Sequence, residues 1–159
     1  MCLPGSMTGD DRDEFQRRWD HLGGPIVRVE QDVPAPPAEV CAAWLDPQRL
    51  ATWWWPQWPD TTYEIDARTG GRFRIHSDRA QLGAHGEYLH LGPEDEPEIL
   101  MTWNWDNEGP SAAEELVRVR FESRDGVGTT VVMEHKLADP DLDVENPTQG
   151  WTDVMARLA

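Results

Sequence analysis

The sequence predicts an α+β domain in which a curved antiparallel sheet of about seven strands wraps around a long C-terminal helix. Between residues 61 and 137, six runs alternate apolar and polar side chains, which is typical of half-buried strands. A similar run at 25–33 adds one strand near the N-terminus, and 148–159 has the pattern of a helix. Such a sheet encloses space between its concave face and the closing helix.

The elements before the main sheet follow in order. A polar leader, residues 1–24, contains a short amphipathic helix in which Phe15, Trp19 and Leu22 recur at intervals of three to four residues. After the strand at 25–33, we expect two short helices over 34–47 and 48–56, because prolines bound both segments. Residues 25–159 are then long enough for a single domain with one core.

Turn residues between the six later strands predict an antiparallel meander. The turn signals lie at Gly70–Gly71, Gly92–Pro93 and Asp125–Gly126. An acidic loop over 139–147 leads into the final helix, which we expect the end of the sequence to cut short.

The charge of the chain excludes some partners. Lys and Arg total 14 against 30 Asp and Glu, so the formal net charge is −16. Phosphate backbones and anionic lipid surfaces repel such a protein. No apolar run approaches the roughly 20 residues of a membrane helix, and the N-terminus lacks the basic-then-apolar order of a secretory signal. We therefore expect a cytoplasmic protein that binds neither nucleic acid nor membrane.

Strand alternation places large apolar side chains on the inner face of the sheet. The inner positions are Ile99, Met101, Trp103 and Trp105 in one run, and Thr129, Val131, Met133 and His135 in another. Indole rings and thioethers on a concave face suit a flat or apolar ligand, although core filling uses the same residues. His135 lies near the start of the closing helix, and it is either hydrogen-bonded in the core or in contact with a ligand.

The segment ATWWWPQWPD, residues 51–60, contains four tryptophans in ten positions. Three consecutive indoles on a helical turn fan across about 200°, so they cannot all face one core. We expect one or two of Trp53, Trp54 and Trp55 in the core, and another, with Trp58, at the entrance of the cavity. Rigid rings lose little entropy on binding, which suits a gate.

Several histidines and one glutamate are candidates for proton transfer or metal binding. On a strand, His85 and Glu87 face the same way and form either an acid/base pair or an ordinary surface pair. His90, five residues from His85, is predicted on the opposite face, so one metal ion cannot readily take both histidines. His76 and His135 are further candidates for proton transfer.

Motifs for metals and cofactors are absent from the sequence. Three alternate aspartates begin DPDLDVE at 139–145 as in a calcium loop, but Val144 and Gly150 stand where such a loop needs glycine and glutamate. No phosphate-binding, dinucleotide-binding, nucleophile-elbow or zinc-protease motif occurs. We therefore expect neither a metal nor a cofactor.

Several segments taken together resemble a known superfamily. They are VPAPPAEVCAAWLDPQRLATWW, DARTGGRFRI, GAHGEYLHL, EILMTWNW, GTTVVMEH and GWTDVMARL. This order is similar to the START-like SRPBCC superfamily, and more narrowly to the family named for homologues of the activator of the heat-shock-protein-ninety ATPase. The resemblance covers about residues 26–159 and implies the helix-grip fold. Function stays open, because the superfamily includes lipid carriers, plant hormone receptors, aromatase/cyclases and co-chaperone domains.

The first functional hypothesis is the binding of a small, largely hydrophobic or aromatic molecule in the cavity between sheet and helix. The candidate ligand-binding residues are Trp54, Trp55, Trp58, Phe73, Tyr88, Met101, Trp103, Trp105, Met133, His135, Trp151 and Met155. One alternative is a cofactor-independent enzyme of the cyclase, dehydratase or hydrolase type, with catalytic candidates His135, His85, Glu87 and His76. Another is a co-chaperone, as the resemblance implies. A homodimer through a sheet face or the leader helix is a further expectation.

Overall fold

A computed structural model describes residues 9–106, 113–124 and 128–159. Its seven strands form one antiparallel sheet in the order β1-β7-β6-β5-β4-β3-β2. The strands are β1 (Ile26–Val33), β2 (Thr62–Ile65), β3 (Arg72–Ser77), β4 (Leu82–Leu91), β5 (Glu98–Trp105), β6 (Glu115–Arg124) and β7 (Gly128–Lys136). This confirms the predicted sheet; the turn expected at Asp125–Gly126 lies outside the described residues.

The helices of the described residues are α1 (Gly9–His21), α2 (Pro37–Leu45), α3 (Pro47–Trp53) and α4 (Glu145–Ala156). Pro37 and Pro47 stand at the start of α2 and α3, where a missing N–H is tolerated. The Asp46 side chain caps α3 by accepting a hydrogen bond from the backbone N–H of Gln48, 2.9 Å away. Within the described ranges, none of the helices has the length and apolar character needed to cross a membrane.

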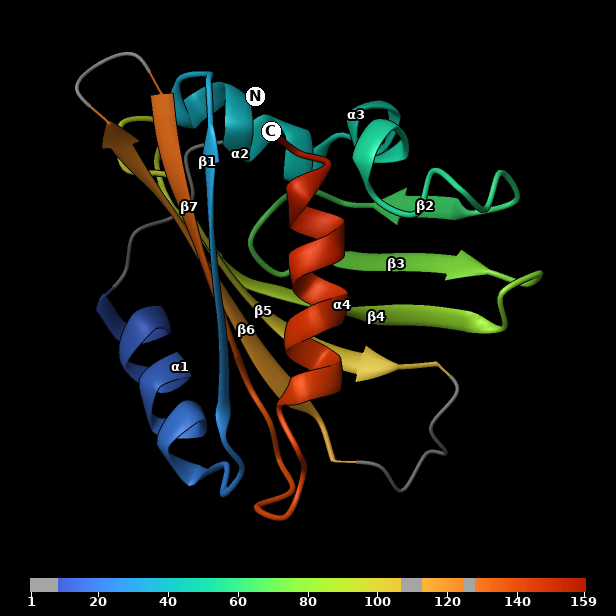
Figure 1. The fold of residues 1–159 in the computed structure, drawn as a ribbon. Helices are drawn as coiled ribbons and strands as arrows, with labels where there is room; N and C mark the ends of the chain where they lie inside the picture. Colours follow the sequence, from blue (N-terminus) through green and yellow to red (C-terminus); the bar gives the residue numbers. More distant parts are fainter. Residues whose placement is uncertain (1–8, 107–112, 125–127) are drawn as a thin grey trace.

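The sheet is strongly curved, and α4 lies against its inner face. In Figure 1, strands β2, β3 and β4 run steeply across the direction of β1, β6 and β7, with α4 in front of them. Trp151 and Met155 of α4 are buried in the main core. Ile99, Met101 and Trp103 of β5 point into the same core, on the face that alternation predicts.

Helix α1 packs on the opposite face of the sheet. Phe15 and Trp19 are buried there against Leu100 and Leu116 in a second, smaller cluster. Arg118 places its guanidinium 4.8 Å from the ring centroid of Trp19, a cation–π contact. This small core explains the three-to-four spacing of apolar residues in the leader.

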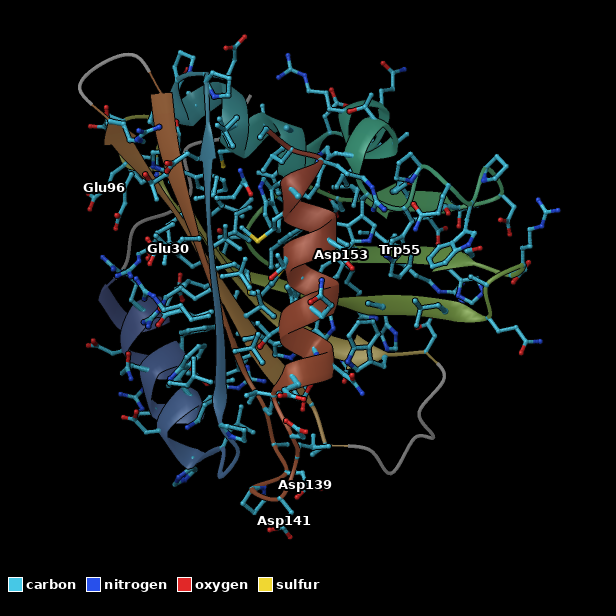
Figure 2. The ribbon with its side chains drawn as sticks, viewed as in Figure 1. Glu30, Trp55, Glu96, Asp139, Asp141 and Asp153 are labelled. Atoms are coloured by element: carbon cyan, nitrogen blue, oxygen red, sulfur yellow. The ribbon has the colours of Figure 1, made fainter. Side chains whose placement is uncertain are left out.

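The acidic excess of the chain lies mostly at the surface. Asp139 and Asp141 in the loop before α4, and Asp153 on α4, are exposed and visible in Figure 2. Glu134 of β7 is an exception, because its carboxylate is buried on the α1 side of the sheet. Arg118 donates to it at 2.7 Å and Arg28 at 3.3 Å. Burial raises the pKa of Glu134, but these arginines and Arg120 outweigh burial and hold the pKa below its ordinary value.

We expect Glu134→Gln to lower the free energy of unfolding by about 1–3 kcal/mol at about pH 7, because the surrounding guanidinium groups lose a charged partner. A depressed folded-state pKa gives stabilisation that is present above the ordinary carboxyl pKa and is lost as pH falls through the folded-state value. The difference between variant and wild type should therefore shrink at about pH 3. Urea unfolding at both pH values measures the difference in the free energy of unfolding. Glu30→Gln serves as control, because Glu30 is an exposed ion-pair partner of Arg28. A difference that is the same at both pH values would contradict the assignment.

Candidate functional site

An apolar pocket lies between α4 and the inner face of the sheet. Its volume is about 250 Å³. The lining residues are Trp54, Trp55, Leu82, Trp103, Trp105, Asn146, Pro147, Gly150, Trp151 and Val154. Trp55 lies beside α4 in the view of Figure 2. We call this the indole pocket, because five of its lining residues are tryptophans.

The pocket is the open side of a network of tryptophan rings. Trp54 lies centrally, with its ring centroid 5.5 Å from that of Trp151 and 6.0 Å from that of Trp103. The rings of Trp103 and Trp151 are 5.1 Å apart, and those of Trp103 and Trp105 are 5.4 Å apart. Edge and tilted contacts of this kind are favourable for aromatic pairs. The pocket wall is therefore held by ring-to-ring packing from α3, its following loop, β5 and α4.

The three consecutive indoles are all buried, contrary to the prediction that they could not share one core. Trp53, Trp54 and Trp55 are 1%, 3% and 6% exposed. The prediction is wrong because it assumed a continuous helix. Helix α3 ends at Trp53, Trp54 is extended, and Trp55 has a left-handed backbone with a φ of 51°. Trp58 is half-buried, with its ring centroid 5.5 Å from that of Trp55.

Two of the indole N–H groups in the pocket wall have no hydrogen-bond partner. The Nε1 atoms of Trp54 and Trp103 are buried and unpaired among the described residues. By contrast, Trp53 donates to the carbonyl of Ala43 at 3.0 Å, and Trp151 donates to His135 at 3.2 Å. A buried donor without a partner is unfavourable by about 1–3 kcal/mol, so such groups call for an explanation.

His135 belongs to a closed hydrogen-bond network in the core. Its Nε2 lies 2.9 Å from a carboxylate oxygen of Glu115, and its Nδ1 accepts the bond from the Trp151 indole. The second oxygen of Glu115 accepts from the backbone N–H of Ala138 at 3.0 Å. Because Nδ1 accepts, Nε2 carries the proton and donates to Glu115. Both ring nitrogens are thus engaged, and the imidazole is 1% exposed.

The other residues proposed to bind ligand lie mostly deeper than the pocket. Phe73, Tyr88, Met101, Met133 and Met155 are buried in the main core and do not line the indole pocket. The sequence reasoning missed five lining residues, which are Leu82, Asn146, Pro147, Gly150 and Val154. One signal was available for Gly150: glycine is unfavourable inside a helix, so its presence in α4 needs a reason.

The surroundings of His85 and His90 differ from the sequence prediction. A bulge between Tyr88 and His90 shifts the pairing of β4 with β5, so that His90 stands opposite Leu100, beneath α1. His90 therefore faces the same side as His85, contrary to the prediction from alternation. The Nδ1 atom of His85 bonds to Asp106, at 2.5 Å, rather than to Glu87. The described residues contain no group of three or more side chains arranged to hold a metal ion.

His76 also bonds to Asp106. Its Nδ1 lies 2.9 Å from the Asp106 carboxylate, and its Nε2 lies 2.7 Å from Asp78. Of the histidines proposed for proton transfer, His76 and His135 thus have both ring nitrogens engaged, whereas Nε2 of His85 has no partner among the described residues. Asp106 was missed because its approach depends on how β4 pairs with β5.

Comparison with solved structures identifies the fold. DynU16, a protein in the dynemicin biosynthetic locus, is 28% identical with a TM-score of 0.68, over 84% of this chain and 45% of DynU16. CalU16 from Micromonospora echinospora is 22% identical with a TM-score of 0.64, over 84% of this chain and 71% of CalU16. An HSP90 activator from Plasmodium falciparum is 19% identical with a TM-score of 0.65, over 84% of this chain and 91% of that protein. The chain thus spans less than half the length of DynU16.

Sequence comparison identifies the family. No curated protein sequence matches the chain. The family model described as "Activator of Hsp90 ATPase homolog 1-like protein" matches residues 34–159, from the end of β1 through α4. Because this match covers most of the chain, the protein belongs to the Activator of Hsp90 ATPase homolog 1-like family, of SRPBCC type with the helix-grip fold.

Proposed function

We propose that the protein binds a small, planar, largely aromatic molecule in the indole pocket. The observation that carries this proposal is the pair of unpaired indole N–H groups, on Trp54 and Trp103, in a wall that is otherwise almost entirely apolar. Ligand sites combine apolar walls with a few polar groups that fix orientation. Both Nε1 atoms are closed off from the pocket space in the free protein. On binding, a shift of the two indole rings exposes these donors to an oxygen acceptor, such as a ketone, on the ligand.

The size of the pocket limits the ligand. An apolar cavity of about 150 Å³ accommodates benzene. The indole pocket, with about 250 Å³, has room for a ligand of about two fused rings. Its open side allows a larger molecule to extend outward past Gly150, which is exposed at the rim.

The backbone of Trp55 gives further support. A bulky residue with positive φ is a conformational outlier that costs on the order of 1–3 kcal/mol. Such outliers cluster at ligand sites, and this one places an indole in the pocket wall. The 28% identity to DynU16 is consistent with a small-molecule role, because that protein is encoded in a biosynthetic locus.

A matched pair of ligands tests the proposal. We expect 2-acetylnaphthalene to bind saturably in isothermal titration calorimetry, and 2-ethylnaphthalene to bind about tenfold more weakly because it cannot accept from an indole N–H. Mass spectrometry of the purified protein under native conditions checks for ligand carried through purification. Equal affinity for the two compounds would contradict the role of the indole N–H groups.

The co-chaperone hypothesis predicts a different result from the small-molecule hypothesis. If neither compound binds, no ligand co-purifies and the protein raises the ATPase rate of an Hsp90, the proposal of a small-molecule pocket is wrong. Binding of the ketone with no effect on Hsp90 turnover would support the pocket as the working site.

A further inference from the structure

A second hollow lies where β3, β4 and the end of β5 run together, and its volume is about 590 Å³. The lining residues are Glu64, Arg72, Phe73, Arg74, His85, Gly86, Trp105 and Asp106. Arg72 and Arg74 alternate with the buried Phe73, so the arginines belong to the face turned away from the main core. Trp105 lines this hollow as well as the indole pocket. We call it the arginine hollow.

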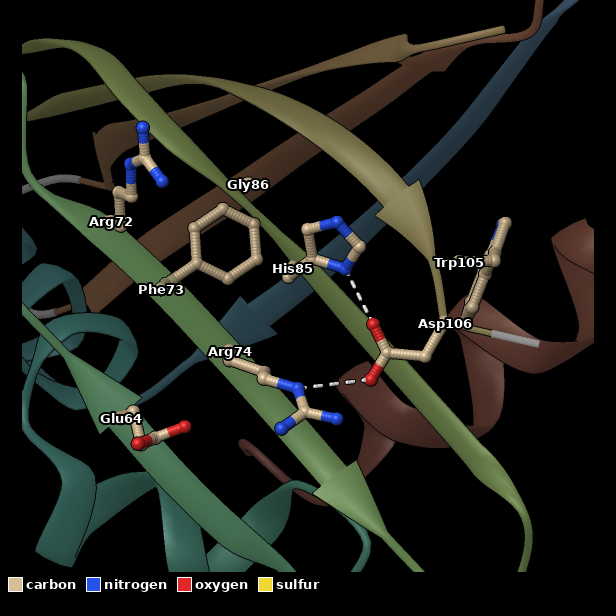
Figure 3. A pocket seen from close by; sticks show the side chains of 8 residues that line it. All are labelled: Glu64, Arg72, Phe73, Arg74, His85, Gly86, Trp105 and Asp106. Atoms are coloured by element: carbon tan, nitrogen blue, oxygen red, sulfur yellow. Dashed lines mark hydrogen bonds and ion pairs between the residues drawn. The ribbon is translucent and has the colours of Figure 1, made fainter. Parts of the chain in front are cut away.

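Asp106 organises the polar side chains of the arginine hollow. One carboxylate oxygen bonds to Nδ1 of His85, and the other accepts from Nε of Arg74 at 3.2 Å (Figure 3). The second oxygen also accepts from Nδ1 of His76 at 2.9 Å. The side chain of Asp106 is 12% exposed. Three donors from two neighbouring strands therefore converge on one partly buried carboxylate.

Gly83 leaves the space in which the side chains of Asp106 and His76 meet. A Cβ atom at residue 83 would lie 2.3 Å from Nδ1 of His76 and 2.4 Å from a carboxylate oxygen of Asp106. Both distances are too short for any side chain, so only glycine leaves room for the contact between Asp106 and His76. Glycine at residue 83 thus permits the observed contact between Asp106 and His76.

The ionised carboxylate of Asp106 orients His85. Burial raises the pKa of Asp106, but the hydrogen bonds from His85, His76 and Arg74 outweigh it and hold the pKa below its ordinary value. An ionised carboxylate only accepts, so His85 carries a proton on Nδ1. Its Nε2 has no partner among the described residues, and the side chain is 50% exposed. Asp106 is therefore a positioning residue that fixes the tautomer of His85 and leaves Nε2 without a partner among the described residues.

The arginines supply charge that the chain itself does not neutralise fully. Arg72 makes no hydrogen bond or ion pair with any described residue. Arg74 uses Nε for Asp106, which leaves its terminal nitrogens available. Arg72 and Arg74 thus place two guanidinium groups side by side on the same face of β3. Guanidinium groups bind carboxylates and phosphates with paired hydrogen bonds.

We propose that the arginine hollow is a second binding site, for a small molecule that carries an oxyanion group such as a carboxylate or a phosphate. Arg72 and Arg74 bind the oxyanion, Nε2 of His85 hydrogen-bonds to the ligand, and Trp105 forms an aromatic wall. Two carboxylates of the hollow, Glu64 and Asp106, oppose binding. Asp106 is paired with Arg74, whereas Glu64 has no ion-pair partner among the described residues. This site shares only the Trp105 side chain with the lining of the indole pocket, and it does not depend on the function proposed for that pocket.

Titration of the full chain with sodium benzoate and with inorganic phosphate, at constant ionic strength, tests the proposal. The readout is the imidazole signals of His85 in NMR spectra, with calorimetry for the dissociation constant. We expect saturable binding of at least one anion, and Arg72→Gln should weaken it about tenfold, because a charge-assisted contact is lost. Preference for benzoate indicates an aromatic carboxylate as the ligand class, and preference for phosphate indicates a phosphorylated compound.

Three variants separate specific binding from general charge effects. Arg17→Gln removes the same charge from an exposed position of α1 and should leave binding within about twofold of wild type, because isolated surface charges contribute little. Glu64→Gln should tighten binding, since it removes the unpaired opposing carboxylate. Gly150→Leu, in the indole pocket, should leave it unchanged. Absence of saturable binding for both anions, or equal weakening by Arg72→Gln and Arg17→Gln, would overturn the proposal.

Discussion

Gly150→Leu should weaken binding of 2-acetylnaphthalene by about 100-fold or more while leaving the protein folded, because a packed side chain would occupy the space of the ligand. Gly150 lines the indole pocket, and a Cβ atom placed on it meets no other atom within 4 Å. A Cβ atom at this position therefore has open space around it. The substitution tests the pocket without removing any residue of the core.

Stability distinguishes pocket blocking from unfolding. Glycine inside a helix is less favourable than alanine by roughly 0.5–1 kcal/mol, and leucine is close to alanine in helix propensity. Both Gly150→Ala and Gly150→Leu should therefore raise the free energy of unfolding, as measured by urea denaturation. Loss of ligand together with a gain in stability would exclude unfolding as the cause of the lost binding.

A matched substitution on the same helix serves as control. Ala156 is exposed on α4 and does not line the indole pocket, so Ala156→Leu should leave the dissociation constant unchanged. Gly150→Ala, with one added methyl group, should have an intermediate effect on binding. If Gly150→Leu binds the ketone as wild type does, the ligand lies elsewhere.

His135→Ala should lower the free energy of unfolding by about 3 kcal/mol, because the buried Glu115 carboxylate loses the hydrogen bond that the imidazole donates to it. His135 is 1% exposed and Glu115 is 8% exposed, so water does not readily replace the imidazole. The Trp151 indole N–H loses its acceptor in the same variant. Since Trp151 holds α4 to the sheet, the loss affects the packing of the closing helix.

Further substitutions resolve the contribution of each hydrogen bond. Glu115→Gln removes the charge but keeps an oxygen that accepts from Ala138, so a smaller loss of about 1–2 kcal/mol is expected. In the double variant, the two losses should not add, because the second substitution removes the carboxylate that His135→Ala leaves unpaired. Urea unfolding of the four proteins measures the coupling. A His135→Ala protein with unchanged stability but altered ligand binding would contradict the structural role.

The engaged nitrogens of His135 also bear on the enzyme hypothesis. A general base needs a free lone pair within reach of the substrate. His135 and His76 have none in the described structure, whereas His85 has an exposed Nε2 and a carboxylate behind it. Among His76, His85 and His135, the free nitrogen thus belongs to His85, at the arginine hollow.

Local sequence patterns were sufficient to predict the sheet and the side chains on each of its faces. Period-two alternation in 97–105 predicted correctly that Ile99, Met101 and Trp103 face the core, because a regular strand turns successive side chains to opposite sides. The same rule failed at His90, where the bulge after Tyr88 inserts an extra residue on one strand. Sequence carries no clear mark of that bulge, since it arises from the pairing of β4 with β5.

The sequence by itself determined the order of elements, the acidic surface and the amphipathic leader, because these follow from spacing and composition within short segments. Only the tertiary structure decided which residues meet. Trp54 and Trp103, 49 positions apart in the sequence, share one pocket wall with unpaired N–H groups. Asp106 reaches His76 and His85 only because strand pairing brings the end of β5 beside Gly83. Contacts between distant segments depend on register, bulges and helix ends, and a single residue of difference in any of them changes which side chains converge.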